Sequence, residues 1–259
     1  MSNPEVIQAF RQWAPEFILV VGWYHIVPKE IRDMAKRGAV GLHASMLPNY
    51  RGGAPLVWAL INGESETGIS LFYLDDGVDT GNIISQRKIP IKLNDTIKTL
   101  YAKAEEEGIN LLVENLPLIV ENKQTVFQQP MPNAFHQKVW AQRSPDDGLI
   151  NWNSSALELY NFIRAQTKPY PGAFTYLHGK KTTIWEGKLF DWIPKNGRGG
   201  EIIGVVREGP LKGILVATRC NDCSLLITDL SISGKNYTGI EFIEKGMASV
   251  GCVFGGRSK

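Results

Sequence analysis

The strongest constraint on the fold is a change of periodicity near residue 121. Before that point, short and continuously apolar runs at residues 17–22, 39–42 and 68–74 alternate with segments of helical spacing. Such an alternation is typical of a parallel sheet that is covered by helices on both faces. The first half of the chain is therefore predicted to be an α/β domain with a small sheet, whose first strand begins at residue 17.

The second half has a different pattern. A polar, proline-containing stretch over residues 121–147 is followed by an amphipathic helix over residues 154–166, with Ser154 or Ser155 as its N-cap. Only strand-like segments follow, at residues 173–177, 181–190, 201–206, 213–217 and 225–232. Five short strands with glycine-rich turns between them are typical of a small barrel.

Charge and hydropathy exclude several classes of protein. The chain has 28 basic and 26 acidic residues, a formal charge of +2, which gives no general attraction to nucleic acid. Its longest apolar run is far too short to span a bilayer, and its N-terminus lacks the layout of a signal peptide. We therefore expect a soluble cytoplasmic protein without a membrane partner.

The three cysteines do not indicate a disulfide framework in a chain of 259 residues. Cys220 and Cys223 have the spacing of half a zinc site, but a structural zinc needs four ligands, and only Cys252 and His178 lie anywhere near in sequence. The Asn-Asp pair between Cys220 and Cys223 suits a hairpin turn. A turn is therefore expected at these cysteines, and no metal.

The most informative stretch starts at His43, where a strand ends. Its loop contains Gly52 and Gly53, which allow the backbone to approach a ligand closely, and it leads into a helix N-terminus that favours an anionic group. The later apolar run over residues 68–74 is followed by a loop that contains Asp79. Because ligands of open α/β sheets bind at the carboxyl ends of the strands, we expect His43 and a carboxylate to meet there as an acid–base pair. The alternative from the residues alone is a structural histidine beside ordinary turns.

The segment from His43 to Pro48, together with Arg51-Gly52 and Asp79-Thr80-Gly81, closely resembles the 10-formyltetrahydrofolate-dependent formyltransferases. That family includes methionyl-tRNA formyltransferase, the sugar N-formyltransferases and the hydrolase domain of formyltetrahydrofolate dehydrogenase. The step of 36 residues from His43 to Asp79 matches the family's spacing between its catalytic histidine and aspartate. The resemblance is dense over residues 15–90 and resumes at 143–148 and 170–174, where it favours the nucleotide-sugar relatives.

The resemblance implies a catalytic pair, His43 and Asp79, in which Asp79 fixes the tautomer of the imidazole. It implies that 10-formyltetrahydrofolate is the co-substrate and that the reaction needs no metal. The backbone of two segments would edge the pterin ring, and a third segment would line the folate pocket. These predicted donor-binding residues are His25, Ile26 and Val27, then Asp75, Asp76, Gly77 and Val78 at the pterin edge, and Ser45, Met46, Leu47 and Pro48 in the pocket.

The resemblance also implies the domain plan. We predict a partial, Rossmann-like parallel sheet in a catalytic domain over residues 1–125, a linker over 126–150 and an OB-like β-barrel domain over 151–259. Members of the family usually have two or three further strands before the run at residues 17–22, so the catalytic domain is expected to be incomplete at its N-terminus. The edge strand left unpaired is a predicted site of association, including a homo-oligomer.

One departure concerns the chemistry. The family has an asparagine two positions before the histidine, where it hydrogen-bonds the formyl oxygen, and this chain has Gly41. The predicted function is transfer of a formyl group from 10-formyltetrahydrofolate to a primary amine, foremost that of a nucleotide-linked amino sugar. Residues 151–259 contain 14 basic and 9 acidic residues, only a mild excess for binding tRNA. The alternatives are a methionyl-tRNA formyltransferase, a formyltetrahydrofolate hydrolase and a non-catalytic folate-binding remnant.

Overall fold

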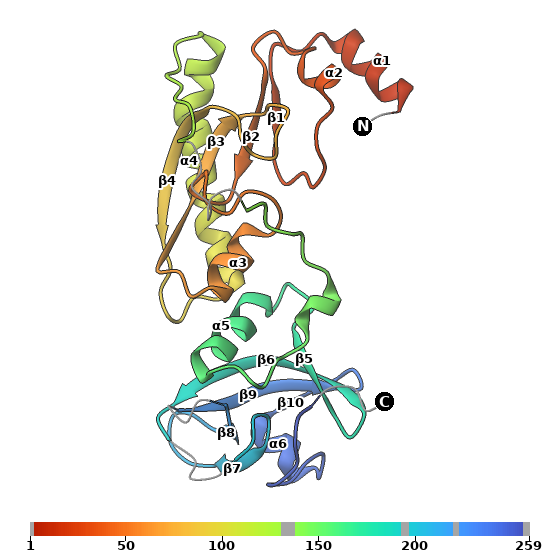
Figure 1. Cartoon of the computed structure of the whole chain (residues 1–259), viewed down its shortest axis with the longest axis vertical. Helices are drawn as coiled ribbons and strands as arrows, with labels where there is room; N and C mark the ends of the chain where they lie inside the picture. Colours follow the sequence, from red (N-terminus) through yellow and green to blue (C-terminus); the bar gives the residue numbers. More distant parts are fainter. Residues whose placement is uncertain (1–2, 131–137, 193–196, 220–222, 256–259) are drawn as a thin grey trace. The chain divides into compact units, whose positions relative to one another are not determined.

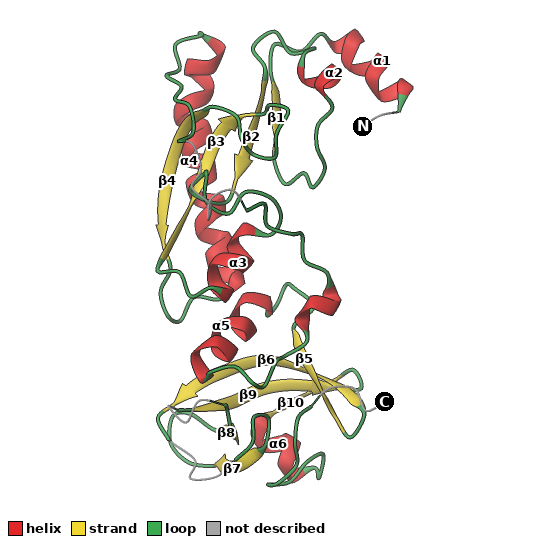
Figure 2. Cartoon of the chain, in the orientation of Figure 1, coloured by secondary structure: helices red, strands yellow, loops and turns green. Residues whose placement is uncertain are grey.

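The structure is a computed structural model that describes residues 3–130, 138–192, 197–219 and 223–255. The chain divides into two compact units (Figure 1). Unit 1 comprises Met1–Ala59, Glu64–Leu93 and Thr99–Arg143, and unit 2 comprises Leu60–Gly63, Asn94–Lys98 and Ser144–Lys259. Unit 1 combines a sheet with helices, whereas most regular elements of unit 2 are strands (Figure 2).

The first part of the chain alternates helices and strands. Its elements are α1 (Pro4–Trp13), β1 (Ile18–Val20), α2 (Lys29–Arg32), β2 (Ala39–His43), α3 (Pro55–Ile61), β3 (Glu66–Tyr73), β4 (Ile83–Pro90) and α4 (Ile97–Val120). The four strands form one sheet in the order β1-β2-β3-β4. Helix α4 packs on one face, where Gly108 lies against the side chains of Leu42 and Ile69. Because side chains alternate along a strand, His43 projects from the opposite face.

The predicted α/β class is confirmed, but strand β3 runs opposite to the direction expected in a parallel sheet. Only β1 and β2 pair in parallel, whereas β2–β3 and β3–β4 are antiparallel. Strand β3 is buried from Thr67 to Phe72, so both of its faces are covered. Burial on both faces produces a continuous apolar run whatever the direction of the strand, and the sequence pattern therefore does not report the direction.

The helical spacing of residues 28–37, which begin at a proline suited to a first turn, predicts a longer helix than the observed α2. Helix α2 ends at Arg32, and the amides of Lys36 and Arg37 donate to the carbonyls of Pro15 and Glu16 instead of continuing the helix. These bonds fix the entry into β1, which pairs only with β2 among the described strands. The side chain of Leu19 in β1 is 37% exposed. Association at this edge stays a prediction.

The second part of the chain contains every strand that the sequence predicts there. Its elements are η1 (Pro145–Gly148), α5 (Ala156–Gln166), β5 (Ala173–Leu177), β6 (Lys180–Phe190), β7 (Ile202–Val206), β8 (Gly213–Val216), β9 (Ser224–Ile232), β10 (Lys235–Thr238) and α6 (Gly239–Glu244). The strands form an antiparallel sheet in the order β5-β6-β9-β8-β7, with β10 beside β9. The predicted strands are thus confirmed, whereas closure of the sheet into an OB-like barrel stays a prediction, and β10 and α6 were not predicted.

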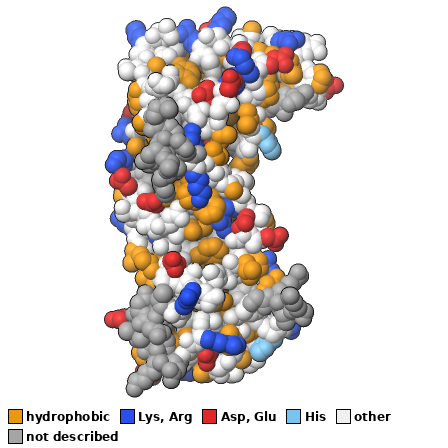
Figure 3. All heavy atoms as spheres, in the orientation of Figure 1, with side chains coloured by type: hydrophobic (Ala, Val, Ile, Leu, Met, Phe, Trp, Pro, Cys, Tyr) orange, Lys and Arg blue, Asp and Glu red, His pale blue; other side chains and the backbone are white. Residues whose placement is uncertain are grey.

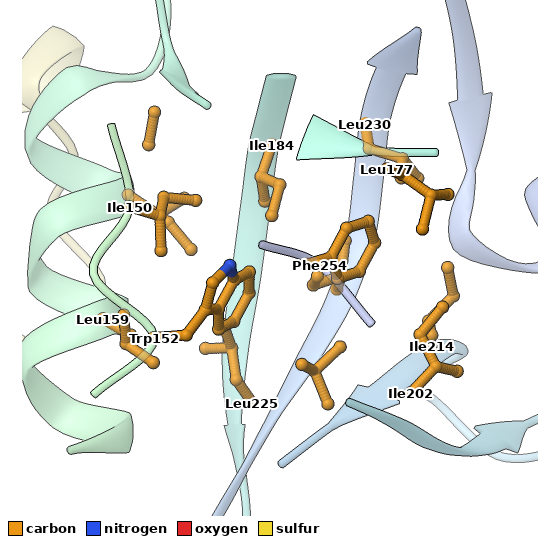
Figure 4. Packing of buried hydrophobic residues seen from close by; sticks show 14 of the residues in the cluster. Ile150, Trp152, Leu159, Leu177, Ile184, Ile202, Ile214, Leu225, Leu230 and Phe254 are labelled. Atoms are coloured by element: carbon orange, nitrogen blue, oxygen red, sulfur yellow. The ribbon is translucent and has the colours of Figure 1, made fainter. Parts of the chain in front are cut away.

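The core of unit 2 forms between the sheet and helix α5. The helix begins at a capping box in which Ser155 and Glu158 satisfy each other's backbone amides. Leu159 on the helix and Trp152 just before it lie within the cluster of buried side chains that Figure 4 draws. The rings of Trp152 and Phe254 are stacked with their centroids 5.6 Å apart. In the described part of the chain, helices are too short or too polar to cross a bilayer.

Candidate active site

His43 is the last residue of β2, and its side chain is buried. Its Nε2 lies 2.8 Å from the carbonyl oxygen of Tyr50. A carbonyl oxygen can only accept a hydrogen bond, so Nε2 is the atom that carries the proton. In the neutral ring, the lone pair is therefore on Nδ1. The Tyr50 carbonyl thus fixes the tautomer, a role that the sequence analysis gave to Asp79.

Asp79 lies beside His43 in the loop between β3 and β4. Its Oδ2 is 3.5 Å from His43 Nδ1, and it accepts a hydrogen bond of 2.8 Å from the backbone amide of Gly52. The side chain of Gln129 holds the loop by donating to the carbonyls of Asp79 (2.9 Å) and Gly81 (2.8 Å). The structure therefore brings together the imidazole and the carboxylate that the sequence analysis paired.

The route by which the pair meets is not the predicted one. In the antiparallel pairing of β2 and β3, Tyr73 lies opposite Val40, so the end of β3 lies far along the sheet from His43. The pair forms because the loop after β3 folds back along β2. Asp75 shapes this turn by accepting hydrogen bonds from the amide of Gly77 and the hydroxyl of Thr80.

The predicted pocket residues 45–48 follow His43 and are fixed to the sheet. The hydroxyl of Ser70, on β3, donates to the carbonyl of Ser45 (2.6 Å) and accepts from the amide of Leu47 (3.1 Å). The side-chain amide of Gln86, on β4, donates to the same hydroxyl and to the carbonyl of Leu47. Ser45 and Leu47 are buried, whereas Met46 and Pro48 are partly exposed.

The two predicted pterin-edge segments are joined by Arg32, which the sequence analysis missed. Its buried guanidinium donates to the carbonyl of Val27 (3.1 Å) in one segment. It also donates to the carbonyl of Leu74 (3.4 Å), just before the other segment, and forms an ion pair with Asp76 within that segment. Arg32 lowers the pKa of the Asp76 carboxyl through this hydrogen bond and its charge. Of the other residues in the two segments, Val78 is partly exposed. The exposed ones are His25, Ile26, Asp75 and Gly77.

Gly41 lies two residues before His43 on the same face of β2, directly opposite Phe72. A Cβ atom at Gly41 would lie 3.0 Å from Leu74 Cδ2 and 3.1 Å from Phe72 Cε1. Phe72 is buried in a small cluster with Leu47 and Ile83. The space beside Gly41 is therefore occupied by the Phe72 and Leu74 side chains.

Of the residues considered for a metal, Cys220 lies outside the described residues, and Cys252 and His178 lie close to each other. Within residues 3–130, 138–192, 197–219 and 223–255, no three His, Cys, Asp or Glu side chains come together in a group that fits a metal ion. Cys252 Sγ lies 3.7 Å from His178 Nε2, on the surface of unit 2. The predicted hairpin turn falls on residues 220–222, outside the described residues.

The comparisons with known proteins match both units. A family model described as "Formyl transferase" matches residues 1–116, and one described as "Formyl transferase, C-terminal domain" matches residues 143–246. Methionyl-tRNA formyltransferase of Geobacter sulfurreducens is 35% identical over 235 residues, which are 91% of this chain and 70% of that protein. The bifunctional polymyxin resistance protein ArnA of Wigglesworthia glossinidia brevipalpis is 40% identical over 191 residues, 73% of this chain and 28% of that protein.

Solved structures share the fold at lower identity. HypX from Aquifex aeolicus, in complex with tetrahydrofolic acid, has a TM-score of 0.68 at 17% identity, covering 96% of this chain and 42% of that chain. An N-formyltransferase from Helicobacter canadensis, in complex with folinic acid and dTDP-3-aminofucose, has a TM-score of 0.56 at 23% identity. That match covers 85% of this chain and 73% of the other.

Proposed function

The chain belongs to the formyl transferase family, and from this premise we propose that it transfers a formyl group from 10-formyltetrahydrofolate to a primary amine. The observation that carries the proposal is the pairing of His43 and Asp79 at 3.5 Å on the face of the sheet opposite to α4. An amine must lose a proton as it attacks a formyl carbon, and an imidazole with a free nitrogen beside a carboxylate is suited to take it.

In the proposed reaction, His43 takes one proton and returns it, so that its protonation state is the same before and after turnover. The amine nitrogen forms a bond with the formyl carbon, and the bond between that carbon and N10 of the folate breaks. His43 Nδ1 takes the proton that the amine loses, while Nε2 keeps its proton on the Tyr50 carbonyl. The same proton then passes from Nδ1 to N10, so that tetrahydrofolate leaves as a neutral amine and the histidine returns to its starting state.

Asp79 stabilises the charged form of His43 in this scheme. Once protonated, the imidazolium has its Nδ1 3.5 Å from Asp79 Oδ2, in a partly buried position where charges attract more strongly than in water. The hydrogen bond from the Gly52 amide holds that carboxylate in place. The formyl oxygen gains negative charge in the same step, and Gly41 has no side chain to stabilise it. Loss of one such donor typically slows turnover by about 100- to 1000-fold.

We assign the folate donor to the segments that contain His25–Val27, Ser45–Pro48 and Asp75–Val78. Two observations support this assignment. Arg32 joins the first and third segments through the carbonyl of Val27 and the side chain of Asp76, and Ser70 fixes the second to the sheet. Backbone groups held in this way are preorganised to bind the polar edge of a heterocycle.

The buried Arg32 gives a prediction on stability and donor binding. Arg32→Met removes hydrogen bonds from a charged group to buried carbonyls, and we expect a loss of about 2–4 kcal/mol in the free energy of unfolding. Binding of folinic acid should weaken as well, because the two segments lose their common partner. Urea denaturation and calorimetric titration measure the two effects.

The matched control is Lys29→Met on the same short helix. Lys29 forms an exposed ion pair with Asp33, which is worth at most about 1 kcal/mol. Equal effects of the two substitutions on the free energy of unfolding would show that Arg32 does not hold the two segments together. A destabilised Arg32→Met protein that binds folinic acid as tightly as the wild type would place the donor elsewhere.

We propose a nucleotide-linked amino sugar as the acceptor. Residues 151–259 carry only a mild basic excess, and on the face drawn in Figure 3 basic and acidic side chains are interspersed over both units. The Helicobacter canadensis enzyme, which shares the fold and was solved with dTDP-3-aminofucose, supports the same choice. The second candidate is methionyl-tRNA, which the likeness to the Geobacter sulfurreducens protein favours.

The two acceptors are separated by an assay at several salt concentrations. We expect formylation of a UDP- or dTDP-linked amino sugar with little dependence on salt. Formylation of methionyl-tRNA with an affinity that falls steeply as salt rises would reverse this choice, because phosphate contacts release counterions. Release of formate without any acceptor would instead favour the hydrolase, and binding of folinic acid without any turnover would favour the non-catalytic remnant.

A further inference from the structure

His43 and Asp79 are both held by one loop. The Tyr50 carbonyl accepts from His43 Nε2, and the Gly52 amide donates to Asp79 Oδ2, each at 2.8 Å. The two groups lie two residues apart in the chain, so a shift of this loop moves both partners of the pair together.

The backbone of this loop is in a conformation that needs support. Tyr50 has φ +55° and Gly52 has φ +99°, both in the left-handed region, which an L side chain such as that of Tyr50 rarely adopts. Such a conformation persists where the surrounding contacts determine it.

The support comes from residues 138–142, here called the strap. The amide of Trp140 donates to the carbonyl of Arg51, and the amide of Gly53 donates to the carbonyl of Trp140, both at 2.8 Å. The strap lies so close that a Cβ atom at Gly52 would be 2.4 Å from the Trp140 carbonyl oxygen. Glycine is therefore required at this position both for the backbone angle and for the approach of the strap.

The side chain of Trp140 adds contacts with two aromatic rings, one stacked and one tilted. Its ring is buried, stacks on Tyr50 with centroids 5.0 Å apart, and lies 4.9 Å from the ring of Trp58 on α3. The indole N–H of Trp58 donates to the carbonyl of Ala141, which ties the strap to that helix. Lys138 places its ammonium 3.6 Å from the centre of the Trp140 ring.

We propose that Trp140 is a positioning residue for the His43–Asp79 pair. It acts through the Tyr50 carbonyl and the Gly52 amide, which hold the two reacting side chains. The inference rests on the proposed function for its kinetic consequence, but the geometry that it describes is independent of the acceptor and of the donor.

Trp140→Ala tests the proposal. We expect kcat to fall by about 10- to 100-fold, because a small displacement of a catalytic group has an effect of this size, with KM for the formyl donor little changed. The Nε2–H proton of His43, assigned in the NMR spectrum by its loss in a His43 variant, should exchange faster with water. Trp140→Phe keeps a ring on Tyr50 and should recover most of the rate.

Two further variants complete the test. Trp13 on α1 is 69% exposed, and Trp13→Ala should leave both readouts unchanged. Gly53→Ala displaces the strap without altering Trp140, because its Cβ would lie 2.5 Å from Gln142 Cα, and it should reproduce the faster exchange if Trp140→Ala fails to fold. A wild-type rate and unchanged exchange in Trp140→Ala overturn the proposal. If the wild type forms no formyl product, the proposed function fails, and the exchange of the His43 proton still decides the role of the strap.

Discussion

Replacing His43 with alanine is expected to lower kcat for formyl transfer by about 100- to 10,000-fold, the range that a general acid–base residue contributes. The reason is that Nδ1 is the nitrogen free to take the proton of the amine, since the Tyr50 carbonyl accepts the proton on Nε2. Binding of folinic acid should change little, because the donor is assigned to backbone groups of other segments. Single-turnover kinetics with saturating donor measure this effect.

Asp79→Ala and the double variant sharpen this prediction. If His43 and Asp79 act as one unit, the double variant should be no slower than His43→Ala alone, because residues that act together are not additive. His178→Ala is the matched control, since His178 is exposed in unit 2 and should not affect turnover. A His43→Ala protein that keeps the wild-type rate, with its folding verified by circular dichroism, would remove the histidine from the reaction.

The second large effect is expected at Gly41. An asparagine at this position would supply the side-chain donor that the family uses at the formyl oxygen. In this chain Phe72 and Leu74 fill the space, so we expect Gly41→Asn alone to destabilise the protein by about 1–3 kcal/mol through overpacking, without a gain in rate. Combining it with Leu74→Ala makes room for the amide, and kcat should then rise by about 100-fold over Leu74→Ala alone.

Leu74→Ala is the reference because it removes the blocking side chain and keeps the carbonyl that accepts from Arg32. Steady-state kinetics of the three variants and of the wild type measure the gain. A double variant that is no faster than Leu74→Ala would show that Gly41 does not face the formyl oxygen. A stable and faster Gly41→Asn single variant would show instead that Phe72 and Leu74 move aside without cost.

The local elements could be predicted because periodicity and burial determine them. The five strands after residue 172 and helix α5 with its Ser155 cap are present as predicted. The direction of β3 could not be predicted, since burial on both faces gives the same apolar run in either direction. The end of α2 depends on hydrogen bonds to residues 15 and 16, which local propensity does not contain. Helix α6 had a readable signal in the capping box of Thr238 and Glu241.

The candidate site was predictable only in part. The histidine and the aspartate could be paired from their motifs, although the strand-end argument used for them does not apply to an antiparallel β3. Arg32 could not be found, because a basic residue in a short amphipathic segment is normally exposed. Only its burial in the folded chain brings it to the carbonyl of Val27. The same holds for Trp140, whose partners are about 90 residues away in the chain.

If the chain moves a formyl group from a folate to an amine, the carbon of that group must pass from one molecule to the other. The most direct measurement follows the carbon itself, with 10-formyltetrahydrofolate isotopically labelled in its formyl group and mass spectrometry of the acceptor. We expect the label to appear on the amine of a nucleotide-linked amino sugar in an amount equal to the tetrahydrofolate formed. Label that stays on the folate, or that is released only as formate while every amine remains unlabelled, would contradict the proposed transfer.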